Sequence, residues 1–352
     1  MKEKIFLVLV STLITIFTIE IFSKRIISEK LQRLNYNEKI SSFYDIHYKN
    51  LHHLSTHPKD FKDVENINSL LFRTLGNGAT KILIHGDSWG AQFEIKKSKK
   101  LLLKFAKKYD LQFILAGNSS YSFSPLTAQL TKLRDDFSIF PKFIIIIVDQ
   151  TDIGDELCRY QNLRYKSNGR VYVKPDPIGT TRIYSIGNYL EQCRILNSSG
   201  FAIKNLIDHK KFVIELNKNV NEKGYPCTSK SILKKLEKEI SNEDKNYIIE
   251  VINDYTENVF DNDNLDKLFI VTHPHRNHIT NEYRLDIKDL ILESLNTLDN
   301  GDSIILIDQF NFNYYSNLDS VFVAGDITSH LNENYFIENF VKKILKTLET
   351  YL

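Results

Sequence analysis

The sequence of 352 residues has few cysteines, prolines and glycines and almost no net charge. Three cysteines are too few for a disulfide-based scaffold in a chain of this length. Seven prolines and 13 glycines exclude collagen-like and low-complexity chains. A net charge of +2 argues against nucleic acid as a partner, because proteins that bind it need an excess of lysine and arginine. With 42% hydrophobic residues, the chain is not intrinsically disordered and can bury a substantial core.

One long hydrophobic run lies near the amino terminus, at residues 5–22 (IFLVLVSTLITIFTIEIF), and its one charged residue is Glu20. A helix of this length, at ~1.5 Å per residue, approaches the ~30 Å thickness of a bilayer core. Lys2 and Lys4 precede the run, as in a secretory signal, but no small-residue cleavage site follows it. We therefore predict that residues 1–23 form a transmembrane anchor or signal anchor; a buried core helix is the alternative.

The charges that flank this run leave its orientation open. The basic residues that follow it are Lys24, Arg25, Lys30 and Arg33. Because lysine and arginine favour the cytoplasmic side of a membrane, they do not favour export of the domain that follows. The chemistry of the candidate site favours an extracytoplasmic catalytic domain, and on that basis we predict a single-pass, membrane-anchored protein. The cysteines fit either one disulfide in an oxidising compartment or three thiols in a reducing one.

Residues 24–75 are predicted to form a helical stalk, and the pattern changes in residues 76–352. Five short apolar runs occur there, at 81–85, 111–116, 143–148, 268–272 and 303–307. Runs of this length without polar alternation are typical of parallel strands that are buried on both faces. Amphipathic helices are predicted at 91–109, 286–298 and 335–352. This alternation predicts an α/β fold with a doubly wound sheet of five parallel strands.

The connection between the third and fourth predicted strands is unusually long, since one crossover helix would suffice there. We predict a large insertion at about 157–265 that shapes the substrate site as a lobe or lid. Within it, Arg170–Val173 and Thr181–Tyr184 are predicted to pair as a hairpin, and residues 229–240 and 245–260 to form charged helices.

The segment Gly86-Asp87-Ser88-Trp89-Gly90 follows the first predicted strand. In doubly wound sheets, ligands bind at the carboxyl ends of the strands, so Ser88 lies where a ligand is expected. Its N–H would lie at the amino terminus of a helix, where backbone donors stabilise an anion. Helix capping by Asp87 and Ser88 is the structural alternative.

A nucleophilic serine needs a general base, and the base needs an acid that orients it. Asp326 and His330 stand four residues apart, directly before the last predicted helix. A loop at that position follows the last strand and therefore lies at the same edge of the sheet as Ser88. Ser88, His330 and Asp326 are the candidate nucleophile, general base and orienting acid.

These two motifs resemble those of the SGNH/GDSL hydrolase superfamily, over about residues 80–155 and 265–350. The resemblance implies a flavodoxin-like sheet and cofactor-independent hydrolysis of esters, often acyl groups on glycans or lipids. It also implies an oxyanion hole formed by Ser88, by Gly117 after the second strand, and by Thr151 after the third. Two features depart from the family pattern: Thr151 stands where the family has asparagine, and one extra residue separates Asp326 from His330.

Further side chains near the strand ends are expected to contact the substrate, namely Asp87, Trp89, Gln150, Asp152, His273 and His275. Three histidines within six residues (273–278) could instead bind a metal ion, but no matching ligand cluster occurs elsewhere, and we predict no metal.

The sequence therefore predicts a membrane-anchored serine esterase that acts on an acylated glycan or lipid-linked saccharide, with O-acetyl groups as one candidate. It predicts no cofactor and no nucleic-acid partner. An O-acyltransferase with the same triad and a non-catalytic saccharide-binding module remain alternatives, and a histidine-rich metallohydrolase is the least favoured.

Overall fold

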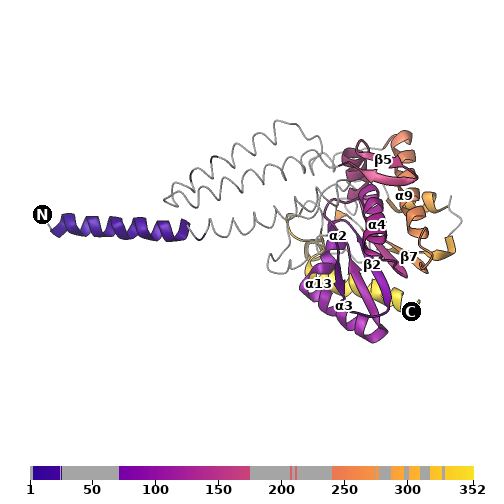
Figure 1. The fold of residues 1–352 in the computed structure, drawn as a ribbon, viewed down its shortest axis with the longest axis horizontal. Helices are drawn as coiled ribbons and strands as arrows, with labels where there is room; N and C mark the ends of the chain where they lie inside the picture. Colours follow the sequence, from indigo (N-terminus) through magenta and orange to yellow (C-terminus); the bar gives the residue numbers. More distant parts are fainter. Residues whose placement is uncertain are drawn as a thin grey trace. The chain divides into compact units, whose positions relative to one another are not determined.

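The computed structural model describes residues 3–23, 25, 71–174, 207, 211, 240–273, 275–276, 287–296, 301–309, 318–326 and 330–352. The chain divides into two compact units, and the second, which contains Asn68–Lys174 and Pro226–Leu352, holds the α/β domain (Figure 1). Most of the predicted stalk, the predicted strand 181–184 and the predicted helix 229–240 lie outside the described residues.

The N-terminal helix Glu3–Ser23 is long and apolar enough to cross a membrane, a property that signal sequences share. Its most apolar window has a mean hydropathy of 2.5 and is not buried by other parts of the chain. The polar side chains of the helix are satisfied locally. The hydroxyls of Ser11, Thr12, Thr15 and Thr18 each donate to a carbonyl oxygen three or four residues earlier. These groups therefore do not need water as a partner.

All five predicted strands are present and parallel: β2 (Thr80–Gly86), β3 (Leu111–Leu115), β4 (Phe143–Val148), β7 (Lys267–Thr272) and β8 (Ile304–Asp308). The sheet has six strands, in the order β1-β3-β2-β4-β7-β8. The sixth strand, β1 (Arg73–Leu75), pairs antiparallel with β3 at the edge. The sheet is therefore mixed and mostly parallel, whereas the sequence analysis predicts five parallel strands and no more.

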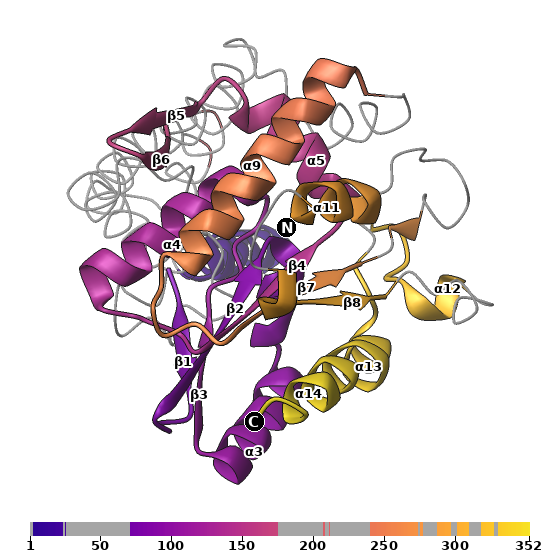
Figure 2. The same cartoon turned by 90° about the vertical axis from the view of Figure 1, so that its right-hand side faces the viewer.

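Helices cover both faces of the sheet (Figure 2). On one face lie α2 (Ser88–Ala91), α3 (Lys96–Tyr109), α13 (Glu333–Tyr335), the π-helix η7 (Phe336–Val341) and α14 (Lys342–Glu349). On the other face lie α4 (Phe123–Phe137), α9 (Asn242–Phe260) and α11 (Ile287–Leu295). The helices predicted at 91–109, 286–298 and 335–352 correspond to α3, α11 and the η7–α14 segment.

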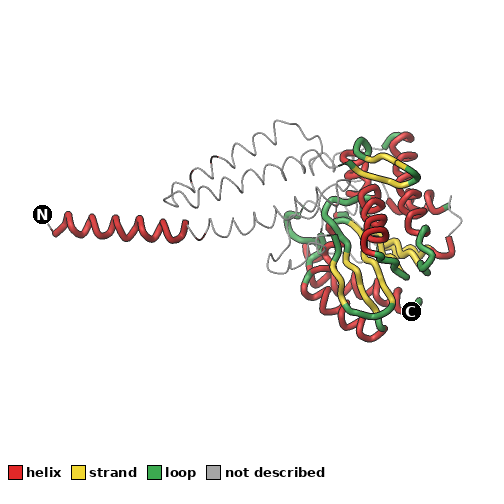
Figure 3. The backbone as a smooth tube through the Cα atoms, viewed as in Figure 1, coloured by secondary structure: helices red, strands yellow, loops and turns green. Residues whose placement is uncertain are grey.

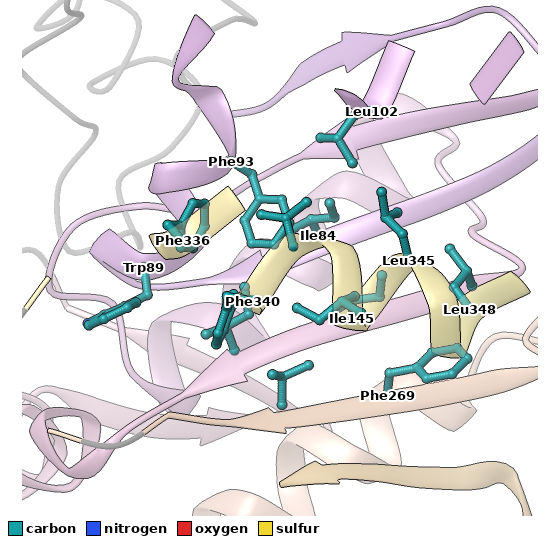
Figure 4. Packing of buried hydrophobic residues seen from close by; sticks show 14 of the residues in the cluster. Ile84, Trp89, Phe93, Leu102, Ile145, Phe269, Phe336, Phe340, Leu345 and Leu348 are labelled. Atoms are coloured by element: carbon teal, nitrogen blue, oxygen red, sulfur yellow. The ribbon is translucent and has the colours of Figure 1, made fainter. Parts of the chain in front are cut away.

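Successive strand residues pack into opposite cores, as the pleat requires. In β2, Ile82 and Ile84 belong to the core beneath α3 and α14, whereas Leu83 belongs to the core beneath α4 and α9. Figure 4 shows the first core, where Phe340 and other side chains of the C-terminal helices lie over the strands. Each fully buried aliphatic or aromatic side chain contributes about 1.5–3 kcal/mol. Apolar residues are needed on both faces, which explains why the strand sequences do not alternate.

The segment after β4 contains α5 (Gln150–Asp155), the π-helix η4 (Glu156–Tyr160) and a two-stranded hairpin that lies apart from the main sheet (Figure 3). The predicted strand Arg170–Val173 exists as β6 and pairs with β5 (Arg164–Ser167), whereas its predicted partner, 181–184, lies outside the described residues. Asn168 and Gly169 form the turn, with φ of 51° and 75°. Asn-Gly is the preferred sequence for such a two-residue turn.

The last part of the predicted insertion is a helix of the main fold. Helix α9 packs Ile248, Val251 and Ile252 into the core shared by α4 and α11. It is therefore the crossover helix that leads from β4 towards β7. Cys158 forms a disulfide, and the other two cysteines lie outside the described residues.

Candidate active site

Ser88 is the first residue of α2 and lies at the carboxyl end of β2. The chain turns sharply there because Gly86 has a φ of +143°, and a side chain on it would meet the carbonyl oxygen of Ile147 at 2.8 Å. Asp87 caps the helix, since its Oδ1 accepts the N–H of Trp89 at 2.7 Å. The N–H of Ser88 belongs to the first helical turn, where backbone donors have no acceptor within the helix.

The structure brings Ser88, His330 and Asp326 together in a line of hydrogen bonds. The Oγ of Ser88 lies 2.8 Å from Nε2 of His330, and Nδ1 of His330 lies 2.6 Å from Oδ2 of Asp326. A carboxylate can only accept, so Nδ1 of neutral His330 carries the proton and Nε2 accepts from the hydroxyl of Ser88. His330 and Asp326 are about one-fifth exposed, so the line of bonds is reached from solvent.

Backbone hydrogen bonds join the two segments that carry Asp326 and His330. The N–H of Val323 donates to the carbonyl of His330 at 2.9 Å, and the N–H of Asn332 donates to the carbonyl of Val321 at 2.8 Å. The His330 N–H also donates to Oδ2 of Asp326, at 3.4 Å. The longer spacing between the acid and the base is therefore compatible with a direct contact between their side chains.

Gly117 lies against Gly90 and Ala91 of α2, the helix that Ser88 begins, because two backbones meet there. A side chain on Gly117 would lie 2.1 Å from the carbonyl carbon of Gly90, so only glycine fits against α2. The neighbouring N–H groups of Ala116 and Asn118 donate to β2 carbonyls. Ser88 and Gly117 are both partly exposed, as oxyanion donors must be.

Both donors of Thr151, the predicted third oxyanion donor, bind within the protein in this structure. Its N–H donates to Oδ1 of Asp149 at 2.7 Å, and its hydroxyl donates to the same oxygen. Asp149 is the N-cap of α5, and Asp152 returns the capping contact by accepting the N–H of Asp149. Both Thr151 donors are therefore used to cap a helix.

The residues predicted to contact the substrate are buried inside the protein: Asp87, Trp89, Gln150, Asp152, His273 and His275. The rings of Trp89 and His273 are in contact, with centroids 3.2 Å apart and planes tilted by 38°. Gln150 accepts the N–H of His275 through its Oε1 at 3.4 Å. A substrate binds to accessible atoms, so we assign these residues to the buried layer beneath the site.

Three of the carboxyl groups beneath the site form a buried acidic cluster. Suitable oxygens of Asp87, Asp149 and Asp152 lie within 4.8 Å of one another. Burial raises the pKa of Asp149 to about 6 and raises the pKa values of Asp87 and Asp152 further above their usual range, with mutual repulsion adding to the effect on the latter two. Oxygens at this spacing can share protons or bind a cation. Oδ2 of Asp87 lies 3.1 Å from Oγ of Ser88 and is an alternative acceptor to Nε2 of His330 for the single hydroxyl proton.

The histidine segment after β7 does not form a metal site in the part of the chain that the structure describes. His273 is fully buried between Trp89 and Phe340, and its two ring nitrogens have no hydrogen-bond partner there. Burial is the largest of the effects that lower the pKa of His273 well below its usual value. Arg276 pairs with the exposed Asp319 at 2.8 Å, which is a surface ion pair. His278 lies outside the described residues.

Sequence reasoning missed two buried polar groups that support the strand ends. His85 in β2 contacts the hydroxyl of Tyr255 at 3.0 Å and Oε1 of Gln129 at 2.7 Å, and burial lowers its pKa to about 4. Glu156 is fully buried and accepts from four donors, which come from Ser122, Ser124 (twice) and Tyr247. The one signal in the sequence is the polar His85 at the end of an otherwise apolar run.

The sequence matches no protein-family model, no curated protein and no solved structure.

Proposed function

We propose that the protein is a serine hydrolase of ester bonds that works by the SGNH/GDSL mechanism. The observation that carries the proposal is the line of hydrogen bonds from Ser88 through His330 to Asp326, with distances of 2.8 and 2.6 Å. A serine hydroxyl is a weak nucleophile until an adjacent base accepts its proton. Here the base is in contact, and its other nitrogen is held by a carboxylate in the tautomer that the reaction needs.

The chemistry proceeds in two halves. Nε2 of His330 takes the proton of Ser88 while Oγ bonds to the acyl carbon, and the same proton then passes to the departing alcohol. Water, activated by His330, attacks the acyl-serine and releases the acid. The N–H groups of Ser88 and Gly117 stabilise the oxyanion of both tetrahedral intermediates. Asp326 stabilises the imidazolium that forms in each half.

The order of the strands supports a flavodoxin-like sheet of the SGNH type. Counted in chain order, the five parallel strands lie as 2-1-3-4-5 across the sheet. This order is shared by flavodoxin-like folds, which bind ligands at the carboxyl edge between the first and third strands. Ser88 follows the first of these strands, β2, and therefore lies at that edge.

The proposed substrate is an O-acylated glycan or a lipid-linked saccharide outside the cytoplasm. The N-terminal helix could anchor the protein in a membrane as a single pass. The disulfide at Cys158 suits an oxidising, extracytoplasmic compartment.

The proposal is tested with the full-length protein and its Ser88→Ala variant. We expect the wild type to hydrolyse p-nitrophenyl acetate and to react covalently with a fluorophosphonate probe, and Ser88→Ala to do neither while it unfolds at the same temperature. Ser303→Ala is the matched control, because Ser303 lies at the amino end of β8, across the sheet from the site. Turnover and labelling that survive in Ser88→Ala would exclude Ser88 as the nucleophile. A stable wild type that gives neither signal would point to a non-catalytic module.

A further inference from the structure

Helix α3 carries an exposed basic face. It contains seven lysines among its 14 residues and no acidic residue. The lysines whose side chains are exposed are Lys96, Lys97, Lys100, Lys104, Lys107 and Lys108. Leu103 is 45% exposed and lies beside them, between the lysines and the buried side that carries Leu102 and Ala106. The outer face of the helix is therefore a row of positive charges bordered by one exposed apolar side chain.

Most of these charges are not neutralised by neighbours. Lys97 lies 3.7 Å from Glu333, and Lys108 lies 2.8 Å from Glu349. Over the described ranges of the chain, no carboxylate pairs with the remaining exposed lysines, which are Lys96, Lys100, Lys104 and Lys107. Self-repulsion of a lysine row destabilises a helix slightly, so the row is not explained by the stability of α3.

The two faces of the domain differ in charge. The helices that share the face of α3, namely η3 (Gln92–Glu94), α13, η7 and α14, bring its total to ten lysines and four glutamates. The helices of the opposite face, α4, α9 and α11, carry four basic and nine acidic residues. Figure 2 shows these two groups on opposite sides of the sheet. Several of the acidic residues are paired with bases of the β5–β6 hairpin, because Arg164 and Lys166 contact Asp254 and Arg170 contacts Asp135. The α3 face is therefore the side with a local excess of positive charge, and an anionic partner would be attracted to it.

We propose that the α3 face binds an anionic phospholipid surface. An acidic protein would also be attracted to lysines, but the chain itself carries a helix that is able to enter a membrane, which favours lipid as the partner. Flexible, unpaired lysines suit phosphate headgroups, which present no fixed geometry. The exposed Leu103 suits the boundary between headgroups and acyl chains, where a basic helix inserts its apolar side chains. Each lysine near such a surface strengthens association about fivefold.

The test measures the contact of α3 with lipid in the full-length protein. Leu103→Trp adds a reporter, and the wild type is its blank because its one tryptophan, Trp89, is buried. The protein is reconstituted into phosphatidylcholine vesicles with or without phosphatidylglycerol, both containing lipids brominated in the acyl chain. We expect quenching of the added tryptophan only in the anionic vesicles, and expect 0.5 M salt to reverse it.

Two further variants of the Leu103→Trp protein decide whether α3 is responsible. Lys100→Gln, Lys104→Gln and Lys107→Gln together should weaken the contact about a hundredfold and abolish quenching. The control set Lys132→Gln, Lys166→Gln and Lys245→Gln removes the same charge from the α4–α9 side and should leave quenching unchanged. Equal quenching in neutral vesicles, or equal loss in both sets, would overturn the proposal. Binding of soluble polyanions such as heparin without any quenching would overturn it in favour of an anionic polymer.

This contact is independent of the proposed chemistry. Ser88→Ala should keep the quenching, and the triple α3 variant should keep p-nitrophenyl acetate turnover, so failure of one proposal does not resemble failure of the other.

Discussion

Replacing Thr151 by valine separates the hydrogen bond in the structure from the role that the family resemblance assigns to this residue. Both donors of Thr151 bind Oδ1 of Asp149. Valine keeps the shape of the side chain and the N–H but lacks the hydroxyl. We expect Thr151→Val to hydrolyse esters at nearly the wild-type rate and to be less stable than the wild type. If the hydroxyl were an oxyanion donor, the rate would fall by about 10²–10³.

The loss of stability depends on the charge of Asp149. The pKa of this carboxyl lies at about 6, so it is mostly neutral at pH 5 and ionised at pH 8. A hydrogen bond to a neutral group contributes about 0.5–1.5 kcal/mol, and one to a charged group about 1.5–3 kcal/mol. Thr151 lowers the pKa of Asp149, so the variant has a still higher folded-state pKa. Stability is lost as the pH rises from the unfolded value through the folded one, and the deficit of the variant therefore grows between pH 5 and 8.

Urea unfolding at pH 5 and pH 8 and turnover of p-nitrophenyl acetate measure the two effects. Thr127→Val is the matched control, because Thr127 is also buried but its hydroxyl donates to a neutral carbonyl of its own helix. The control should lose stability equally at both pH values. A hundredfold loss of rate in Thr151→Val with unchanged stability would refute the reasoning and restore Thr151 to the oxyanion hole.

Three other changes have defined outcomes. Asp326→Asn should lower kcat by about 10³–10⁴, because an amide does not fix the tautomer of His330, and a near-normal kcat in the ester assay would contradict the triad. Gly117→Ala should lower the free energy of unfolding in urea by more than about 4 kcal/mol, because the added methyl group would lie 2.1 Å from Gly90. A loss below about 1 kcal/mol would show that α2 can move. Asp152→Asn should raise Tm at pH 8, because burial raises the pKa of Asp152 and ionisation of this carboxyl destabilises the folded protein as the pH rises. The gain in Tm should vanish near pH 3, where the carboxyl is neutral in both the folded and the unfolded state. An equal gain at both pH values would contradict this account.

The main strands could be predicted from the sequence because burial on both faces requires an unbroken apolar run. Each of β2, β4 and β7 is covered on both faces, and an apolar side chain is then required at nearly every position. Strand β1 has three residues, too few to carry a pattern. The pairing of β6 with β5 is not among the predictions, although the dipeptide Asn168-Gly169 marks its turn.

The candidate triad could be predicted because it depends on topology alone. Ser88 and His330 follow the first and last parallel strands, and parallel strands place their carboxyl ends at one edge. The partners of Thr151 and the burial of Trp89 and His273 could not be predicted in this way. These features depend on how side chains pack over a few ångströms. A hydroxyl near the first turn of a helix donates to a helix-capping side chain as readily as to a ligand.

The near-zero net charge has a different physical meaning in the folded protein. As a composition, +2 argues against any partner that is bound by charge. The fold separates the charges, because α3 crosses one face of the sheet whereas α4 and α9 cross the other. Electrostatic attraction depends on the local charge within a Debye length of about 8–10 Å, and the width of the domain exceeds that distance. An anionic surface that approaches α3 is therefore attracted to its lysines and is largely screened from the acidic residues of α9. A net charge near zero excludes partners that bind by charge only when positive and negative residues are mixed on every face of the protein. In this protein they are not mixed in that way.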